Sequence, residues 1–379
     1  MLPIKEHLVI IRTGASLLNL KSYNCQELGL AKSLAKKGLK VSLVLAGENE
    51  KKLDIEIDGH TISIYFVKYI SLNQALGWFF KIETLLRNLQ PTCIQIHEFG
   101  MFMSYRVLRW AKTNNVKTVL IQGSYQTTQK PFFKQLEILF NRTLGQYIIK
   151  NVNAIGCKSF MASKYVKRYV DRPTKLTCVG LDTDKFHNNY HSINWKEKLD
   201  LSNKKVLLYV GIFEPRRNPL FLVKVAKQLS DEFVLIMTGR GILEKELKTY
   251  ITKYKLEHKI KLTGQLKQED LPSLYQAADL FLLASDYEIY GMVILEAMYF
   301  GLPIITTRTA GSEVLINNNS DGIILNNKQE DTWAKTIQEL FSTPNKINSM
   351  KKNAANKIIN NFVWDKSCEQ FLQLYNLNI

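Results

Sequence analysis

The sequence alternates short apolar runs with helix-length segments almost throughout, and it does so in two successive series. Strands are predicted at 7–11, 40–46, 93–97, 117–122, 153–157 and 175–180, and then at 205–211, 232–239, 259–264, 278–285, 303–307 and 322–325. Strands that are joined through helices pair in parallel, because parallel neighbours need a crossover connection. We therefore expect an α/β protein with two parallel sheets, each covered by helices on both faces.

The chain of 379 residues exceeds what one hydrophobic core usually supports, so we expect two domains. The polar segment 187–204 lacks strand signals and is predicted to be the linker between them. The expected domains are 1–187 and 188–362, followed by an amphipathic helix within 363–379. One departure from the alternation is a predicted β-hairpin around Asp58-Gly59. Ligands of open α/β sheets bind beyond the carboxyl ends of strands, so we expect the functional residues there, facing a cleft.

The positive charge is concentrated in the first half of the sequence. Residues 1–190 contain 27 Lys and Arg against 13 Asp and Glu, and residues 76–175 contain 16 against 4. Such a field attracts phosphates, nucleic acid or anionic lipid, although a merely solubilising surface is the alternative. Five scattered cysteines without a C-x-x-C pair favour a reducing compartment. The N-terminal apolar run is too short for a signal peptide, and no apolar window is long enough to span a bilayer.

The segment "VGIFEPRRNPLFLVKVA" (210–226) predicts an anion site after a strand. Arg216 and Arg217 precede a helix that is expected to begin near Asn218-Pro219. Helix N-termini direct amides and a positive dipole end outward, and guanidinium groups bind phosphate through two hydrogen bonds. The alternative is a pair of solvated arginines. In "LIMTGRG", Gly239 and Gly241 form a G-x-G turn, where a plain tight turn competes with close approach to a ligand.

Two glutamates lie in the nearly apolar stretch "DYEIYGMVILEAMYFGLP" (286–303). Glu288 falls on the loop after a predicted strand, and Glu296 lies inside the following short helix. Between them the amides of Gly291, Met292 and Val293 form the helix N-terminus, where N–H groups lack partners. Buried carboxylates need hydrogen-bond donors, which sugar hydroxyls or a neighbouring Arg would provide. The pattern predicts an anion at the amides and hydroxyl groups at both carboxylates, unless the two glutamates are purely structural.

The run "EIYGMVILE" resembles the E-x7-E element of retaining glycosyltransferases of family 4, also called glycosyltransferases group 1. "VGIFEPRRN", "LIMTGRG" and "CVGLDTDKF" are similar to further elements of that family, and the resemblance covers most of 178–364. It implies a GT-B fold, with two Rossmann-like parallel-sheet domains facing a central cleft. The first would bind the acceptor and the second the nucleotide sugar, while the C-terminal helix returns to the first.

The resemblance also implies roles for individual residues. Glu288 would contact the hydroxyls of the transferred sugar, and Glu296 would bind the ribose. Arg217 stands where the family usually has Lys and would hold the diphosphate. The other donor-site positions that it implies are Gly14, Gly211, Arg216, Gly239, Gly241, Gly291, Met292 and Val293. His97 matches a family histidine near the acceptor and is a candidate catalytic residue.

The sequence departs from the family pattern at several of these positions. Ile212 replaces an Arg that usually follows the turn glycine, and Arg216 is the candidate substitute. The first loop lacks the usual double glycine around Gly14. Gln122-Gly123 stands in place of a frequent His-Gly, and a family glutamate is expected at Glu313. These differences affect the details of phosphate binding and the role of the histidine.

No metal or other cofactor is expected. Asp182-Thr183-Asp184 spells D-x-D, but it lies outside the predicted nucleotide site, and the six histidines show no ligand spacing. Arginines and the helix N-terminus would instead stabilise the leaving diphosphate. The family resemblance further implies front-side displacement, in which the leaving phosphate takes the proton of the acceptor.

The acceptor side is predicted from composition alone. "GWFFKIETLLRNL" (77–89) and "KPFFKQLEILFNRTLGQYIIK" (130–150) combine aromatic, aliphatic and basic residues, as helices at anionic membrane surfaces do. Burial of the apolar faces in the core is the alternative. We expect a cytoplasmic protein at the inner face of the plasma membrane that uses a UDP- or GDP-linked sugar and a saccharide or lipid-linked acceptor. A nucleotide-sugar epimerase and a non-catalytic binding protein are the competing functions, and no nucleic-acid module is recognised.

Overall fold

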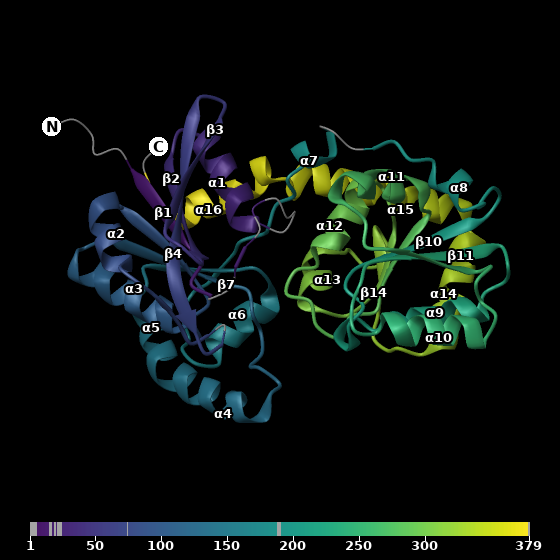
Figure 1. Ribbon diagram of the computed structural model, residues 1–379, viewed down its shortest axis with the longest axis horizontal. Helices are drawn as coiled ribbons and strands as arrows, with labels where there is room; N and C mark the ends of the chain where they lie inside the picture. Colours follow the sequence, from purple (N-terminus) through teal and green to yellow (C-terminus); the bar gives the residue numbers. More distant parts are fainter. Residues whose placement is uncertain are drawn as a thin grey trace. The chain divides into compact units, whose positions relative to one another are not determined.

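The computed structural model describes residues 6–14, 17–18, 20, 25–73, 75–187 and 191–377, without the side chains of residues 132, 185 and 187. The chain forms two compact units (Figure 1). The first unit combines Met1–Gly180 with Trp364–Ile379, and the second is Leu181–Val363. Within the described part of the chain, no helix has the length and apolar character needed to cross a bilayer.

The first unit contains a sheet with the strand order β3-β4-β2-β1-β6-β7-β8-β9, and β5 pairs with β4. The strands are β1 (His7–Ile11), β2 (Lys40–Gly47), β3 (Lys51–Ile57), β4 (His60–Ser71), β5 (Gly77–Phe79), β6 (Cys93–His97), β7 (Lys117–Gln122), β8 (Ala154–Cys157) and β9 (Lys175–Leu176). All pairs are parallel except β3 and β5 with β4. The predicted hairpin is confirmed, and its turn residues Asp58 and Gly59 have φ of 47° and 77°.

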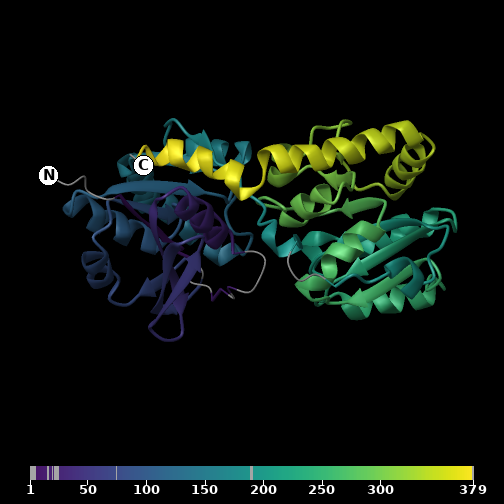
Figure 2. The same ribbon diagram turned by 90° about the horizontal axis from the view of Figure 1, so that it is seen from above.

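Helices of the first unit surround this sheet. They are α1 (Gln26–Lys36), α2 (Ile82–Leu89), α3 (Phe102–Thr113), α4 (Pro131–Phe140), the π-helix η1 (Asn141–Gly145), α5 (Gln146–Asn151), α6 (Phe160–Lys167) and α16 (Trp364–Tyr375). The last of these packs against α1 (Figure 2). Trp364 covers Gly29 so closely that a Cβ there would lie 2.0 Å from its indole Nε1. The Ser33 hydroxyl also donates to Asp365 over 2.8 Å.

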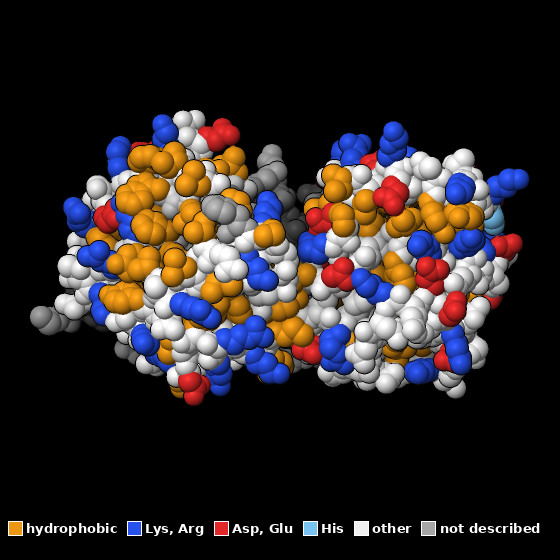
Figure 3. Space-filling view, turned by 90° about the horizontal axis from the view of Figure 1, so that it is seen from below, with side chains coloured by type: hydrophobic (Ala, Val, Ile, Leu, Met, Phe, Trp, Pro, Cys, Tyr) orange, Lys and Arg blue, Asp and Glu red, His pale blue; other side chains and the backbone are white. Residues whose placement is uncertain are grey.

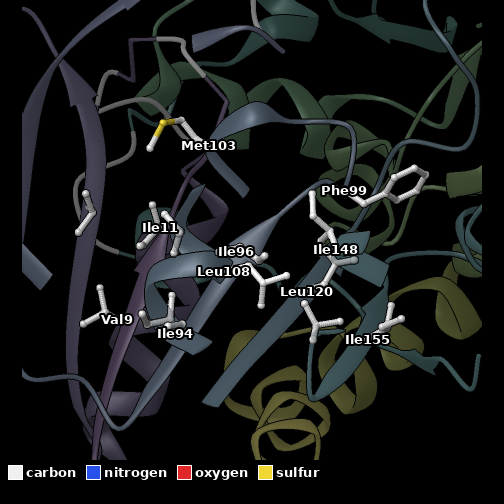
Figure 4. Packing of buried hydrophobic residues seen from close by; sticks show 14 of the residues in the cluster. Val9, Ile11, Ile94, Ile96, Phe99, Met103, Leu108, Leu120, Ile148 and Ile155 are labelled. Atoms are coloured by element: carbon white, nitrogen blue, oxygen red, sulfur yellow. The ribbon is translucent and has the colours of Figure 1, made fainter. Parts of the chain in front are cut away.

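The core of the first unit is built from alternate residues of its central parallel strands. Val9, Ile11, Ile94, Ile96 and Leu120 are fully buried and pack with side chains of α3 and α5 (Figure 4). These strands bury both faces, which explains why their residues are mostly apolar. The carboxyl end of β6 carries His97, which is only partly buried.

The second unit contains a six-stranded parallel sheet of order β12-β11-β10-β13-β14-β15, with helices on both faces (Figure 2). Its strands are β10 (Lys205–Val210), β11 (Phe233–Thr238), β12 (Ile260–Gly264), β13 (Leu280–Leu283), β14 (Ile304–Thr307) and β15 (Gly322–Leu325). Its helices are α7 (Asp184–His187), α8 (Trp195–Lys198), the 3₁₀ turn η2 (Pro215–Arg217), α9 (Pro219–Gln228), α10 (Glu244–Lys253), the 3₁₀ turn η3 (Gln268–Asp270), α11 (Leu271–Ala277), α12 (Met292–Tyr299), α13 (Ala310–Leu315), α14 (Glu330–Phe341) and α15 (Pro344–Asn361). This order is the doubly wound arrangement in which the connections reverse direction between β10 and β13.

The segment expected to be a linker is instead part of the second unit. Trp195 is buried, and its indole N–H donates to the Ser273 hydroxyl over 3.0 Å. Leu201 is also buried. The unit begins at Leu181, whose N–H donates to the Phe362 carbonyl over 2.7 Å, so the expected boundary at residue 187 lies too late. Trp195 and Leu201 stand among polar residues in the sequence, so the segment was interpreted as a linker. Residues 188–190 lie outside the described part of the chain.

Two further expectations differ from the structure. The strand predicted at 175–180 is limited to Lys175–Leu176. In the segment 77–89, Gly77–Phe79 is the strand β5 rather than helix, and α2 begins only at Ile82 after Lys81 with φ of 52°. Alternating burial along β5, with Trp78 exposed between buried neighbours, favours the strand.

Candidate functional site

The second unit brings most of the predicted donor-site residues to the carboxyl edge of its sheet. The loop after β10 carries Arg216 and Arg217, and the loop after β13 carries Glu288. β10 and β13 are hydrogen-bonded neighbours, so the two loops leave the sheet side by side. They flank the place where the order of connections reverses, which is the usual ligand position in such sheets.

Glu288 is buried at this edge, with 6% of its surface exposed. The Ser285 hydroxyl donates to its Oε1 over 2.9 Å. Nη1 of Arg217 lies 3.2 Å from the same oxygen, and Nη1 of Arg216 lies 3.7 Å from it. The two guanidinium groups compensate the buried carboxylate, and Glu288 is thereby held in one orientation. These contacts all fall on Oε1.

A second carboxylate fixes the arginines from the other side. Glu214 Oε1 lies 2.6 Å from Nη2 of Arg216 and 3.3 Å from Nε of Arg217. Arg216 also donates to the Tyr287 carbonyl, and the amide of Asp286 donates to the Arg216 carbonyl over 2.8 Å. The loops after β10 and β13 are therefore tied together by both backbone and side-chain bonds.

Helix α12 begins directly after the Glu288 loop with an uncapped N-terminus. Gly291 is its N-cap, with φ of 79°, and glycine has no side chain that could accept a hydrogen bond from the first turn. The amides of Met292 and Val293 open the helix, where N–H groups and the dipole attract anions. Gly311 of α13 packs against the same loop, because a Cβ there would lie 2.0 Å from the Tyr290 carbonyl oxygen.

Glu296 is buried on α12, with 4% of its surface exposed. The Tyr275 hydroxyl of α11 donates to its Oε2 over 2.7 Å. Tyr275 is itself fully buried and stacks on Phe300 at a centroid distance of 5.5 Å. The sequence predicted that this carboxylate needs a donor, but it did not identify Tyr275, which lies 21 positions away in sequence.

Gly211, Gly239 and Gly241 lie in the loops after β10 and β11, where the backbones approach each other closely. A Cβ at Gly239, whose φ is 146°, would lie 1.8 Å from the Gly211 carbonyl oxygen. A Cβ at Gly241 would lie 2.3 Å from the Phe213 carbonyl oxygen. Phe213 and Arg240 also share a backbone hydrogen bond of 2.9 Å. The glycine requirement is therefore explained by loop packing within the unit, and their contact with a ligand stays a prediction.

Comparison with known proteins agrees with this arrangement. Residues 192–357 match the family model described as glycosyl transferases group 1. The second unit belongs to this family. The UDP-Gal:alpha-D-GlcNAc-diphosphoundecaprenol alpha-1,3-galactosyltransferase of Escherichia coli is 33% identical over 218 residues, which are 55% of each chain. The chain thus matches about half the length of this relative.

Two solved structures share the fold over nearly the whole chain. Sucrose-phosphate synthase from Thermosynechococcus elongatus has a TM-score of 0.78 with 18% identity and covers 98% of both chains. HepE of Anabaena, solved in complex with UDP, has a TM-score of 0.76 with 16% identity and covers 98% of this chain and 100% of that one. The predicted GT-B class, with its two Rossmann-like α/β units, is confirmed.

The remaining predicted residues, Gly14 and His97, lie in the first unit. Gly14 follows β1, and His97 is the last residue of the neighbouring strand β6. His97 is enclosed in a polar network. The Tyr375 hydroxyl of α16 donates to Gln95 Oε1, so the Gln95 amide nitrogen donates to His97 Nε2 over 2.8 Å. The ring proton therefore lies on Nδ1, 3.8 Å from Glu27 Oε1.

Burial lowers the pKa of His97 to about 4, although the carboxylate of Glu27 opposes this change. The imidazole is therefore neutral near pH 7 and is a weak base. It can accept or donate a hydrogen bond, and its proposed contact with an acceptor stays a prediction. Gly14 has open space around its Cα, with no heavy atom within 4 Å of an added Cβ.

Glu98 is a residue that the sequence reasoning missed. It follows His97 and adopts a left-handed backbone with φ of 61°, which is costly for a residue with a Cβ. Its carboxylate accepts from the amides of Gly123 and Ser124 over 3.0 and 3.2 Å, and from the Gln122 side chain. Burial raises the pKa of Glu98, against the lowering by Lys158 and the two amides. Gln122-Gly123 thus forms part of a carboxylate-binding turn.

The described residues contain no group of three or more His, Cys, Asp or Glu side chains that could hold a metal ion. The candidate site of the second unit consists of Glu214, Arg216, Arg217, Ser285, Glu288, the α12 amides and Glu296. Ser285 and Glu214 were not predicted, because a single hydroxyl or surface glutamate carries no distinguishing sequence pattern.

Proposed function

We propose that the chain transfers a sugar from a UDP- or GDP-linked donor to a saccharide or lipid-linked saccharide. The observation that carries this proposal is Glu288, a buried carboxylate bound by Arg216 and Arg217 beside the uncapped N-terminus of α12. This combination offers hydroxyl recognition and anion binding at adjacent positions. A nucleotide sugar presents both groups in that order, with its sugar next to the diphosphate.

The donor would bind along the carboxyl edge of the second unit. The guanidinium groups and the amides of Met292 and Val293 would take the diphosphate. Glu288 directs Oε1 to the arginines, which leaves Oε2 to accept from a sugar hydroxyl. Glu296, fixed by Tyr275, would accept from the ribose hydroxyls. The charge of the leaving group is met by these protein groups, and a metal ion is not part of the proposal.

The proposed reaction is a front-side displacement with retention at the anomeric carbon. The bond between this carbon and the phosphate oxygen breaks as the acceptor oxygen attacks from the same face. The acceptor hydroxyl proton passes to the leaving phosphate oxygen, so no protein base is required. Glu288 would orient the sugar and stabilise its positive charge. His97, neutral at pH 7, would position the acceptor through a hydrogen bond.

The nature of the acceptor is inferred from a relative and from charge. The name of the Escherichia coli relative states a UDP-Gal donor and a diphosphoundecaprenol-linked acceptor. The first half of this chain carries 27 Lys and Arg against 13 Asp and Glu, which suits an anionic lipid-linked substrate. We place the enzyme at the inner face of the plasma membrane, in the synthesis of a surface polysaccharide or glycolipid.

A donor and acceptor screen tests the proposal. The full-length chain is first heated with a panel of nucleotide sugars, since a ligand of the folded state raises the melting temperature. Stabilising donors are then incubated with diphosphoundecaprenol-linked and free saccharides, and the product linkage is determined. Transfer with retained anomeric configuration supports the proposal. Donor conversion without an acceptor would indicate an epimerase, and stabilisation without turnover by any donor would indicate a binding protein.

A further inference from the structure

One region of the first unit exposes more apolar side chains than a soluble surface requires. They are Ile70 at 60%, Leu72 at 87%, Leu76 at 39%, Trp78 at 39% and Phe80 at 36% exposure. They belong to the end of β4, the following loop and β5, except Phe80, which directly follows β5. Single exposed apolar residues are common, but a contiguous set of this kind marks a contact with a partner or a membrane.

The loop that carries Leu72 is held in place by hydrogen bonds. The Leu72 amide donates to the Leu76 carbonyl over 3.2 Å, and the Asn73 Oδ1 accepts from the amides of Ala75 and Leu76 over 2.9 and 2.8 Å. The Phe102 amide at the start of α3 donates to the Ala75 carbonyl over 3.0 Å. These hydrogen bonds fix the backbone of the braced loop in a conformation that leaves Leu72 exposed.

Four aromatic rings continue this surface across three elements. Trp78 of β5 stacks on Phe102 of α3, with centroids 5.8 Å apart and planes at 22°. Phe102 contacts Tyr105 at 6.3 Å, and Tyr105 meets the edge of Tyr147 of α5 at 5.6 Å. Tyr147 is 37% exposed. We call these four rings, with Ile70, Leu72, Leu76 and Phe80, the ladder face.

Basic side chains lie against the rings of the ladder face. The Arg106 guanidinium lies 3.7 Å from the Trp78 ring centroid, Arg109 lies 5.9 Å from Tyr105, and Lys112 Nζ lies 5.6 Å from Tyr147. Arg109 and Lys112 are exposed. Figure 3 shows hydrophobic side chains gathered on the first unit with Lys and Arg among and around them. The face can therefore bury apolar groups against its rings and bind anions through its cations.

We propose that the ladder face seats the chain on an anionic lipid bilayer. Its exposed cations Arg109 and Lys112 match lipid phosphates, whereas Arg106 is paired with Glu83. Residues 76–175 carry 16 Lys and Arg against 4 Asp and Glu. Trp and Tyr side chains favour the headgroup level, while Leu72 and Leu76 extend from the braced loop toward the acyl chains. A saccharide or nucleic-acid platform needs stacked rings and cations, but it gains nothing from exposed leucines. This inference rests on the proposed function only for its purpose, which is access to a lipid-linked acceptor.

The ladder face takes only a few residues from the two segments expected at a membrane, Trp78 and Phe80 from 77–89 and Tyr147 from 130–150. One side of α2 faces the core, since Ile82 and Leu86 are fully buried. The contact is instead made by a loop, a short strand and the outer faces of α3 and α5. The ladder face is therefore a composite of segments that are separated in sequence.

Cosedimentation with vesicles tests the proposal directly. The full-length chain is mixed with phosphatidylglycerol–phosphatidylcholine vesicles and with pure phosphatidylcholine vesicles at low and high salt. Binding is expected with the anionic vesicles, with weakening at high salt. Leu72→Asp should lower the partition coefficient roughly tenfold or more, because an apolar anchor is lost. Ile359→Asp, at a residue of α15 that is 49% exposed, is the matched control and should bind normally.

Three outcomes would overturn the proposal. They are absence of binding to anionic vesicles at low salt, equal losses for Leu72→Asp and Ile359→Asp, and a dimer that Leu72→Asp dissociates. The last result would identify the ladder face as a self-association surface. Donor binding and transfer to a soluble acceptor are measured on the same variants, and both should stay unchanged. Failure of vesicle binding with intact transfer would reject this inference alone, whereas absent transfer with intact vesicle binding would reject only the proposed function.

Discussion

Nη1 of Arg217 lies 3.2 Å from Oε1 of Glu288, although the two residues come from loops after different strands. Both side chains are largely enclosed, at 16% and 8% exposure. The pair links the group expected to bind phosphate with the group expected to bind sugar. The contact therefore places the two groups side by side across the loops after β10 and β13.

Replacement of Glu288 by Gln should abolish most sugar transfer. The amide keeps the shape of the side chain but loses the charge that faces the developing positive charge of the sugar, so we expect kcat to fall about 100-fold or more. Affinity for the free nucleotide should remain, because the arginines and α12 amides are unchanged. Initial rates and calorimetric nucleotide titration measure the two quantities. Glu339→Gln, at an exposed helix pair with Lys335, is the control, and near-normal turnover of Glu288→Gln would refute the role.

Replacement of Tyr275 by Phe should destabilise the second unit and weaken nucleotide binding. It removes the hydroxyl that donates to Glu296 over 2.7 Å and leaves a buried carboxylate short of a donor. The expected loss is about 1–3 kcal/mol in the free energy of unfolding. Urea denaturation and nucleotide titration measure it, with Tyr254→Phe at a partly exposed ring as the control. Equal transition midpoints for the two variants would contradict the structural role of the hydroxyl.

Alanine at Gly239 should disrupt the loops of the site, whereas alanine at Gly264 should cost much less. At Gly239 a Cβ would lie 1.8 Å from the Gly211 carbonyl oxygen, so the two loops must move apart. We expect this movement to lower the free energy of unfolding by about 3 kcal/mol or more. Gly264 has φ of 73° but no heavy atom within 4 Å of a Cβ, so only backbone strain of about 1–2 kcal/mol remains. Denaturant midpoints of the two variants provide the comparison, and similar values would show that the close approach is not required.

Stability should decrease as the pH falls below about 6.5, in part through His97. Its folded-state pKa of about 4 lies below the ordinary value of 6.5, so the unfolded chain binds more protons between these values. This residue alone contributes a slope of up to about 1.4 kcal/mol per pH unit in that window. Near the ring are Glu27, which favours the protonated form, and Arg12 and Lys158, which oppose it.

His97→Gln should flatten, but not remove, this pH dependence. His7 keeps its own contribution, because burial also lowers the pKa of His7 to about 4. Denaturant unfolding at a series of pH values between 4 and 7.5 measures the slope. His258→Gln, at a side chain that is 59% exposed, serves as the control and should reproduce the wild-type profile. An unchanged slope in His97→Gln would show that this histidine is not titrating in the unfolding equilibrium.

Much of the fold could be predicted because the parallel strands are buried on both faces and are therefore mostly apolar. The apolar runs that contain Val9, Ile94 and Leu120 predict buried strands from local sequence alone, before it is known which strands pair. The positions of Arg216 and Glu288 followed from the rule that ligand residues come after strands. By contrast, the boundary near residue 181 depends on Trp195 and Leu201, two isolated apolar residues whose burial is decided only by the surrounding unit.

The parts that could not be predicted depend on contacts between distant segments. The Tyr275 hydroxyl meets Glu296 because α11 and α12 pack together, and Ser285 meets Glu288 because the loop folds back. The ladder face requires β5, α3 and α5 to align their rings. Each of these residues has an ordinary local sequence, so helical or strand periodicity contains no signal for its partner.

The docking of α16 on α1 has a consequence for the order in which the chain matures. The first unit is discontinuous, since its last piece, Trp364–Ile379, is synthesised after the whole second unit. During translation, the surface around Gly29 that Trp364 later covers remains open until the segment from Trp364 onward leaves the ribosome. The second unit has all its residues earlier and can complete its core first. A truncation of the last helix would therefore act at the opposite end of the sequence, by leaving the earliest-made unit unfinished.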